Sequence, residues 1–274
     1  MLSPSTCGLG LFSTVILDTA SSHTIMTSLL NSFPDGARVA LLGASGGIGQ
    51  AMLGLLAADP RVAHVYAFSR NPESAKVPGV TFVRIDLEDE ASIEAAAESA
   101  AGDDALDLVL VTSGVLWSGD DLRPEKAMKE LRADALAKLF AVNAIGPAMV
   151  AKYFLPKLRK GSKTLFAALS ARVGSIGDNR LGGWFSYRAS KAALNMLLKT
   201  LSIEHARQWP ESVVAGLHPG TVDTGLSKPY TSRTPSKQLF TADTSATHLL
   251  RVIDGLSPED TGGVFAWDGK RIDY

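Results

Sequence analysis

Short apolar runs alternate with longer segments of helical spacing from about Arg38 to the end of the chain. Each apolar run is continuous and closed by glycine or polar residues, which is typical of parallel strands buried on both faces. Strands are predicted at residues 38–43, 62–69, 80–87, 106–114, 162–170, 212–220 and 262–269. Because strands and helices alternate, the sequence predicts a single α/β domain, with helices on both faces of a doubly wound, seven-stranded parallel sheet.

Helical spacing fills the intervals between these strands. One helix is predicted at residues 49–58 and an alanine-rich one at residues 88–101. A long helical region is predicted from about Glu125 to Lys160, with a break near Gly146-Pro147, because proline lacks the N–H that a helix interior needs. Another helix is predicted from Ser186 to about Arg207.

Residues 1–36 differ from the rest of the chain, because they are rich in Ser and Thr and contain no Lys or Arg. A secretory signal needs a positive first segment and a transit peptide needs arginines, so neither is indicated. We expect a disordered or loosely attached extension over residues 1–36, with Met26 as an alternative start. The folded domain is expected over residues 37–274.

Composition and charge limit the classes of function. Of the 274 residues, 46% are hydrophobic and 20% charged, and the net charge is −1 with no run rich in Lys and Arg. Neither nucleic acid nor a membrane is therefore expected as a partner, and no apolar stretch is expected to span a bilayer. The single cysteine, Cys7, excludes an intrachain disulfide and favours a cytoplasmic location. The histidines are scattered, so no metal site is expected.

The segment GASGGIG, at residues 43–49, lies between the first predicted strand and the first helix. Gly43 permits a tight turn, Gly47 lets the backbone approach a pyrophosphate, and Gly49 lets the helix pack closely on the sheet. The N–H groups at the start of the helix then face the phosphates. A glycine pattern alone is weak evidence, but the strand before it and the helix after it indicate a dinucleotide site.

The end of the second strand bears on which dinucleotide binds. Sites that prefer NAD place an acidic residue there, whereas this chain has Ser69 followed by Arg70. A guanidinium binds the 2′-phosphate that a carboxylate would repel, so NADP(H) is favoured over NAD(H); the other reading of Arg70 is a solvated surface arginine. Asp86, which precedes Leu87 after the third strand, is placed to accept a hydrogen bond from the adenine amine.

The segment YRASK places Tyr187 and Lys191 one helical turn apart on the same face. Taken alone, such a pair is more often a tyrosine ring packed on a lysine stem at a helix surface. However, GASGGIG, VNAIG (142–146), YRASK and HPGTVDT (218–224), in this order, resemble the short-chain dehydrogenase/reductase family over residues 38–274. The stretch VGSIGDNRLGGWFSYRASKAALNMLLKTL and the FAWDG near the end are most similar to its C-factor/sniffer-like carbonyl reductase branch.

The resemblance implies a Rossmann fold and an NAD(P)-dependent oxidoreductase that reduces an aldehyde or ketone to an alcohol. It implies Tyr187 as general acid/base, Lys191 as the cation that lowers the pKa of this phenol, and Asn143 as the holder of a water behind the lysine. One cation about 5 Å away contributes roughly 3 kcal/mol at an effective dielectric constant of about 20, or about two pKa units. The implied cofactor contacts are Gly43, Ser45, Gly47, Ile48, Gly49, Ser69, Arg70, Asp86, Leu87, Gly114, Tyr187, Lys191, Pro219, Gly220, Val222 and Thr224.

Two departures from the family pattern concern the site. The family's NNAG is replaced by VTSG at residues 111–114, where only Gly114 matches. The family's catalytic serine, three residues before Gly174, is replaced by Ala171. Losing such a contact to the substrate oxygen costs about 3–4 kcal/mol in the transition state. Either Ser170 or Ser175 replaces it, or the enzyme is slow, or the protein is no longer an enzyme.

Ala171 favours an alternative reading, an NAD(P)-binding regulatory or signalling protein of the C-factor type with weak or no turnover. A nucleotide-sugar epimerase is disfavoured, because only about 50 residues remain after HPGTVDT for a substrate domain. We expect a mobile lid over residues 225–240, and Trp184, Phe185 and Trp267 form either a substrate wall or part of the core. The apolar face of the Tyr187 helix resembles the family's dimer surface and implies a homodimer or homotetramer. An amphipathic helix that buries this face within its own subunit would look the same.

Overall fold

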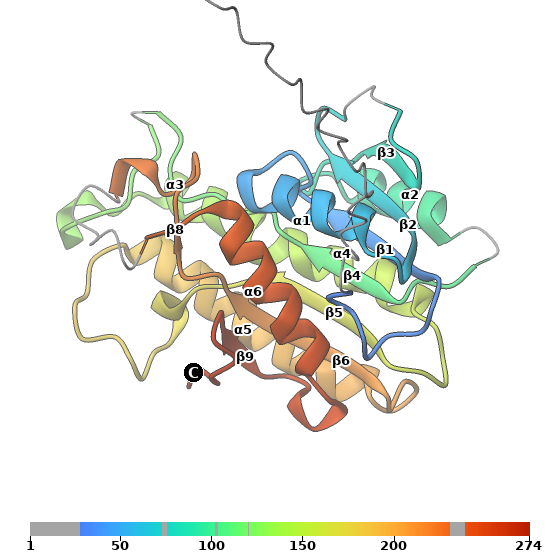
Figure 1. Cartoon of the computed structure of the whole chain (residues 1–274). Helices are drawn as coiled ribbons and strands as arrows, with labels where there is room; N and C mark the ends of the chain where they lie inside the picture. The colour runs from blue at the N-terminus through green and yellow to red at the C-terminus, as the bar shows by residue number, and fades with distance from the viewer. Residues whose placement is uncertain (1–27, 73–75, 102–103, 120, 231–238) are drawn as a thin grey trace, which may run out of the picture.

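The computed structural model describes residues 28–72, 76–101, 104–119, 121–230 and 239–274. One seven-stranded sheet forms its frame, in the order β3-β2-β1-β4-β5-β6-β9 with all neighbours parallel (Figure 1). The strands are β1 (Ala37–Leu42), β2 (Val62–Ser69), β3 (Val80–Arg84), β4 (Leu108–Val111), β5 (Thr164–Leu169), β6 (Ser212–His218) and β9 (Val264–Ala266). The predicted fold class is confirmed. Because the chain order reverses between β1 and β4, a crevice is expected at the carboxyl ends of these strands.

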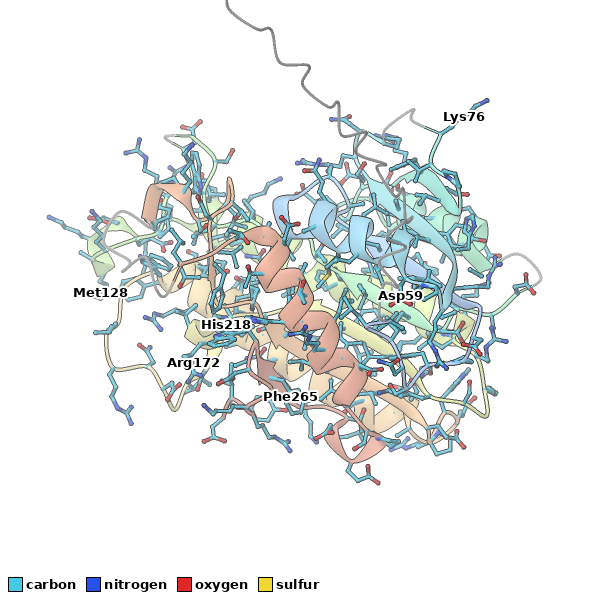
Figure 2. All side chains as sticks on the ribbon, viewed as in Figure 1. Asp59, Lys76, Met128, Arg172, His218 and Phe265 are labelled. Atoms are coloured by element: carbon cyan, nitrogen blue, oxygen red, sulfur yellow. The ribbon has the colours of Figure 1, made fainter. Side chains whose placement is uncertain are left out.

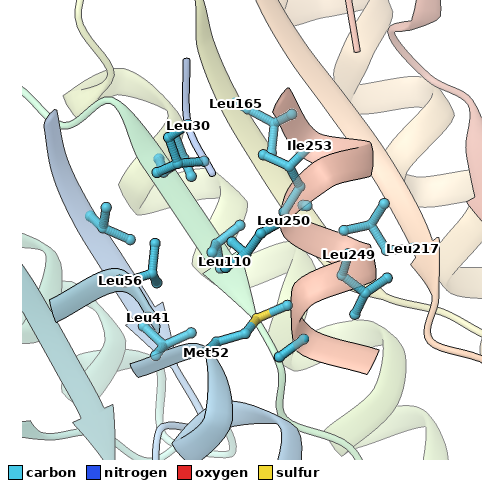
Figure 3. Packing of buried hydrophobic residues seen from close by; sticks show 14 of the residues in the cluster. Leu30, Leu41, Met52, Leu56, Leu110, Leu165, Leu217, Leu249, Leu250 and Ile253 are labelled. Carbon is cyan, nitrogen blue, oxygen red and sulfur yellow. The ribbon is translucent and has the colours of Figure 1, made fainter. Parts of the chain in front are cut away.

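Helices cover both faces of the sheet, as predicted (Figures 1 and 2). One face carries α1 (Gly47–Ala58) and α6 (Ala242–Gly255), and the other carries α2 (Glu90–Ala101), α4 (Gly146–Phe154) and α5 (Phe185–His205). Side chains of a strand alternate between the two apolar cores: Leu110 of β4 lies in the first and Val111 in the second. Figure 3 shows the first core, where Met52, Leu110 and Leu250 gather from three elements.

The helical region predicted from Glu125 to Lys160 differs in two respects. The α-helical part begins only at α3 (Ala133–Phe140), after a 3₁₀ turn η1 (Met128–Glu130). The break expected near Gly146-Pro147 is replaced by a π-helical turn, η2 (Ala141–Ile145), which continues into α4. Pro147 lies in the first turn of α4, where its missing N–H costs little because the wider turn has already interrupted the regular hydrogen-bond ladder.

The stretch Ala133–Lys157 passes a test for membrane spans by length and composition, with a mean hydropathy of 1.3 in its most apolar window. The sequence analysis expected no such stretch. In the structure Val150, Ala151 and Phe154 of this stretch are buried in the core beside α5, whereas Ile145 is exposed. This burial is typical of a core helix of a globular fold.

Two further elements were not predicted: α6, and a small parallel sheet of β7 (Thr221–Val222) and β8 (Leu239–Phe240). β8 falls within the predicted lid, whose residues 231–238 lie outside the described residues. The other predicted strands and helices are present, mostly one to four residues shorter than expected at their ends.

Packing begins before residue 37, in the segment assigned to the extension. Leu30 and Phe33 are buried in the core beside α1 and α6. The carboxylate of Asp59, labelled in Figure 2, accepts hydrogen bonds from the Leu29 N–H at 2.7 Å and the Ser28 hydroxyl at 3.1 Å. Residues 28–36 therefore belong to the packed domain, because two apolar side chains in this Ser-rich segment fill a gap in the core. Cys7 and Met26 lie outside the described residues.

Candidate active site

A cavity of about 780 Å³ lies at the crevice where the strand order reverses. Its walls come from the glycine loop, the carboxyl ends of β2 to β5, the start of α5 and the loop after β6. It brings together most of the predicted site residues: Gly43, Ser45, Gly47, Ile48, Gly49, Ser69, Arg70, Asp86, Leu87, Gly114, Ser170, Tyr187, Lys191, Pro219 and Thr224. Residues that are far apart in the sequence thus form one cleft.

The glycine loop has the conformation that a phosphate site needs. Gly43 has φ +90°, and a Cβ at Gly49 would lie 2.1 Å from the carbonyl oxygen of Gly43. A side chain at either position would therefore open the turn. No side chain caps the start of α1, so the N–H groups of its first turn keep their hydrogen-bonding capacity beside the cavity. These groups fit a pyrophosphate.

The loop after β6 packs directly on the glycine loop. A Cβ at Gly47 would lie 2.8 Å from the Cγ2 of Thr224. Thr224 and Pro219 line the cavity, whereas Gly220 and Val222 do not. Gly220, with φ +80°, instead lies against the rings of Phe240 and Trp267, and Val222 is buried in β7.

The far end of the cleft carries the residues expected at the adenosine half of a dinucleotide. Ser69 is buried at the end of β2, and Arg70 is exposed with no ion pair to any residue that the structure describes. The carboxylate of Asp86 accepts a hydrogen bond from the Glu88 N–H at 3.1 Å, which fixes its direction. Arg70 is therefore a cation beside Ser69 that forms no ion pair with a described residue.

Tyr187 and Lys191 are not a surface pair. Their side chains line the cavity, and their exposed fractions are only 9% and 3%. The Lys191 Nζ lies 5.8 Å from the centroid of the Tyr187 ring and donates a hydrogen bond to the Leu169 carbonyl oxygen at 2.8 Å. The end of β5 thus fixes the ammonium beside the phenol.

The pKa of Tyr187 is shifted in the direction opposite to the expected one. Burial raises the pKa of this phenol to about 12, because it penalises the phenolate. The same cause lowers the pKa of Lys191 to about 8. At neutral pH the phenol is therefore protonated and the lysine is still mostly charged.

Asn143 lies within the π-helical turn and is fully buried. Its Oδ1 accepts from the Val115 N–H at 2.8 Å, and its Nδ2 donates to the Val115 carbonyl at 2.8 Å and to Ser190 Oγ at 3.2 Å. The side chain therefore clamps the backbone just after Gly114 and joins it to α5. A Cβ at Gly114 would lie 3.7 Å from the Lys191 Nζ, an ordinary contact distance, so Gly114 lies beside the ammonium.

The two candidate serines differ in position. Ser170 lines the cavity, and its hydroxyl donates to the Asn195 Oδ1 at 2.6 Å. Ser175 lies outside the cavity lining, where its oxygen accepts from the Asp178 N–H at 3.1 Å in a turn. The expectation that Ser175 reaches into the site is therefore wrong, because the turn holds its hydroxyl. Ala171 packs against the apolar cluster that contains Tyr187 and is not among the residues that line the cavity.

That apolar cluster is the part of the site which the sequence analysis largely missed. It consists of Leu116, Leu122, Ala135, Leu139 and Tyr187, with Val115, Trp117, Ala171, Val173, Trp184 and Tyr230 packed against it. Trp117 also donates from Nε1 to the Gly225 carbonyl at 3.2 Å, which ties it to the loop after β6. Trp117 and Leu122 of this cluster line the cavity, whereas Trp184 packs in the cluster without lining the cavity. Trp267 stacks with His248 and Phe240 away from the cleft. In the sequence, Trp117 after the fourth strand is the residue that could have indicated this apolar cluster.

Comparisons with known proteins agree with this geometry. The profile of the short chain dehydrogenase family matches residues 37–235. The C-signal protein of Myxococcus xanthus is 38% identical over 140 residues, which are 51% of this chain and 78% of that protein. An uncharacterised oxidoreductase of Schizosaccharomyces pombe is 30% identical over 77% of this chain and 87% of its own length. Among solved structures, the NADPH-bound carbonyl reductase from chicken fatty liver superposes with a TM-score of 0.75 at 27% identity. The match covers 88% of this chain and 100% of that chain.

Proposed function

The chain belongs to the short-chain dehydrogenase family of NAD(P)-dependent oxidoreductases, and from this premise we propose that it reduces an aldehyde or ketone to an alcohol with NADPH. The observation that carries the proposal is the placement of Tyr187 and Lys191 in the same cleft as a phosphate-binding glycine loop. A surface tyrosine–lysine pair would lie outside such a cleft. The chicken carbonyl reductase, a structural relative with bound NADPH, supports the direction of the reaction.

The residues present fit the cofactor. The N–H groups of the first turn of α1 would hold the pyrophosphate, Ser69 and Arg70 the 2′-phosphate, and Asp86 the adenine amine. Lys191 would hold the nicotinamide ribose, and Thr224 the carboxamide. NADP(H) is favoured over NAD(H) because a cation, not a carboxylate, follows Ser69.

When bound, NADPH supplies the hydride that adds to the carbonyl carbon. Tyr187 donates its phenolic proton to the carbonyl oxygen as the electron pair of the C=O π bond moves onto that oxygen. The protonated state that burial imposes on Tyr187 is the one that this direction needs. The ammonium of Lys191 then stabilises the phenolate that remains, and Asn143 keeps the backbone at Val115 and α5 in register behind it.

The substrate wall indicates the chemistry beside the carbonyl. Within the apolar cluster of Tyr187, Trp117 and Leu122 line the cavity, and Trp184, Tyr230, Val173 and Ala171 pack in the same cluster. They favour an apolar or aromatic substituent, because burying such a group contributes about 25 cal/mol per Å². We therefore propose small apolar or aromatic carbonyl compounds as the substrate class.

A second candidate function is a nucleotide-binding regulatory protein with slow or no turnover. Ala171 favours it, because alanine stands where the family has its catalytic serine, and so does the similarity to a protein named C-signal. Oxidation of NADPH, followed by absorbance with a panel of aldehydes and ketones, separates the two functions. Turnover supports the reductase, whereas tight NADPH binding without turnover on any carbonyl supports the regulatory protein.

We also propose a cytoplasmic homodimer or homotetramer. Ile145, Met196 and Ile203, on the π-turn before α4 and on α5, are more than half exposed, and a second copy would cover them. Sedimentation velocity tests this assembly, because a monomer at micromolar concentration contradicts it.

A further inference from the structure

The entry into α5 is held from outside the helix. The residue before it, Trp184, has φ 51° and ψ 41° and is the only non-glycine residue with positive φ in the described part of the chain. Its side chain does not cap the helix. The carboxylate of Glu125, far away in the sequence, accepts from the Ser186 N–H at 3.2 Å and from the Ser186 hydroxyl. Glu125 thus supplies the cap that α5 lacks.

The backbone of Glu125 holds the same turn a second time. Its carbonyl oxygen accepts from the Trp184 N–H at 2.6 Å. Gly183, with φ +65°, lies so close that a Cβ there would be 3.5 Å from this oxygen. Side chain and main chain of one residue therefore fix the left-handed Trp184 and the first turn of α5 together.

A carboxylate suits this position, because the N–H groups at a helix N-terminus favour negative charge. Glu125 is only 4% exposed and forms no ion pair with any described residue. A buried charge is retained where hydrogen-bond donors and a helix N-terminus compensate it, as the two Ser186 donors and the α5 dipole do here.

This turn positions the Tyr187 phenol. Tyr187 directly follows Ser186, and the Trp184 ring packs edge-on against the Tyr187 ring at 6.2 Å between centroids. Trp184 also contacts the Tyr230 ring at 5.4 Å, so its orientation shapes the substrate wall as well. If the turn relaxes, the phenol moves relative to Lys191, and misplacement of a reacting group by about 1 Å can cost a factor of about 10² in rate.

We propose that Glu125 is a positioning residue, which acts through Ser186 and Trp184 to aim the Tyr187 phenol at the substrate. The inference rests on the proposed function in so far as Tyr187 is the proton donor. Glu125 touches neither substrate nor cofactor in this account. Removing the Glu125 carboxylate is therefore expected to lower kcat and to leave the affinity for the cofactor unchanged.

The test compares three variants of the full chain with the wild type. Glu125→Ala removes the cap, Glu125→Gln keeps one acceptor oxygen, and Glu130→Ala is the matched control. The Glu130 carboxylate accepts from the Lys126 N–H at 2.7 Å in the same segment but does not reach α5. We expect kcat to fall about 30-fold in Glu125→Ala and about 3- to 10-fold in Glu125→Gln. The Kd for NADPH should stay within twofold, and Glu130→Ala should behave like the wild type.

A kcat within twofold of the wild type in Glu125→Ala overturns the proposal, as does an equal loss in the Glu130→Ala control. If Glu125→Ala does not fold, the Glu125→Gln comparison decides by the same criteria. If the wild type shows no turnover, the proposed function fails on its own. Crystal structures of Glu125→Gln and the wild type then test the positioning directly: a shifted Tyr187 ring supports it, and an unmoved ring overturns it.

Discussion

Lys191 donates to the carbonyl oxygen of Leu169 at 2.8 Å while its Nζ lies 5.8 Å from the Tyr187 ring. The last residue of β5 therefore fixes the position of the cation, and α5 fixes the position of the phenol. The two elements are also locked by Gly174, where a Cβ would lie 2.8 Å from the Lys191 Cβ. The glycine after β5 is thus required by close packing on the lysine itself.

The depressed pKa of Lys191 makes stability depend on pH. Burial lowers this pKa from 10.5 to about 8, so above pH 8 the folded chain has lost a proton that the unfolded chain still holds. Stability therefore rises with pH between about 8 and 10.5, by about 2 kcal/mol over 1.5 pH units. Urea unfolding at pH 8 and 9.5 measures the rise. In Lys191→Met this rise in stability should be smaller by about 2 kcal/mol. An equal rise in the wild type and the variant would contradict the lowered pKa of Lys191.

Arg70 should determine the choice between the two dinucleotides. Arg70→Ala is expected to weaken NADPH binding about 10- to 100-fold, because a charge-assisted bond to the 2′-phosphate is lost. NADH binding should change less than twofold, because NADH lacks that phosphate. Fluorescence titration with both cofactors measures this. Equal losses for the two would show that Arg70 serves the fold or the surface instead.

Ala171 gives an opportunity to gain activity. Ala171→Ser places a hydroxyl in the apolar cluster next to Tyr187, where it can donate to the substrate oxygen. We expect kcat to rise about 10-fold or more, since such a donor is worth up to about 3–4 kcal/mol. Ser170→Ala, whose hydroxyl is bonded to Asn195, serves as the comparison. A lower kcat in Ala171→Ser would mean that the methyl group itself is needed for the substrate.

The glycine loop should tolerate no side chain at Gly49. A Cβ there would lie 2.1 Å from the Gly43 carbonyl, so Gly49→Ala must displace backbone. We expect NADPH affinity to fall at least about 10-fold and stability by about 1–3 kcal/mol. Gly54→Ala, in the same helix with open space around its Cα, is the control and should be neutral or stabilising. Thermal unfolding measures the stability of both variants, and titration with NADPH measures their affinity. Equal values for the two variants would contradict the prediction.

The sequence predicted the elements whose signals are local. β2 begins and ends where expected, because its apolar run is bounded by turn residues, and the glycine loop was recognisable from its place between strand and helix. Side-chain direction was less predictable. Ser175 looked available for the site, but a turn that closes on the Asp178 N–H directs its hydroxyl away.

Long-range partners gave no sequence signal. Glu125 and Ser186 are 61 positions apart, and nothing near Glu125 in the sequence marks it as the cap of α5. The buried Leu30 and Phe33 likewise stand in a Ser-rich segment that looks unstructured by composition. The raised pKa of Tyr187 depends on burial, which the spacing to Lys191 does not reveal.

The most direct test of the account is the turnover of Tyr187→Phe. Loss of the phenolic hydroxyl should lower kcat about 10²- to 10⁴-fold, the usual contribution of a general acid, with the Kd for NADPH within twofold. Tyr153→Phe, which removes an exposed hydroxyl bonded to Glu90, controls for the substitution. A rate in Tyr187→Phe equal to that of the wild type, measured with the same carbonyl substrate and saturating NADPH, would contradict the central claim.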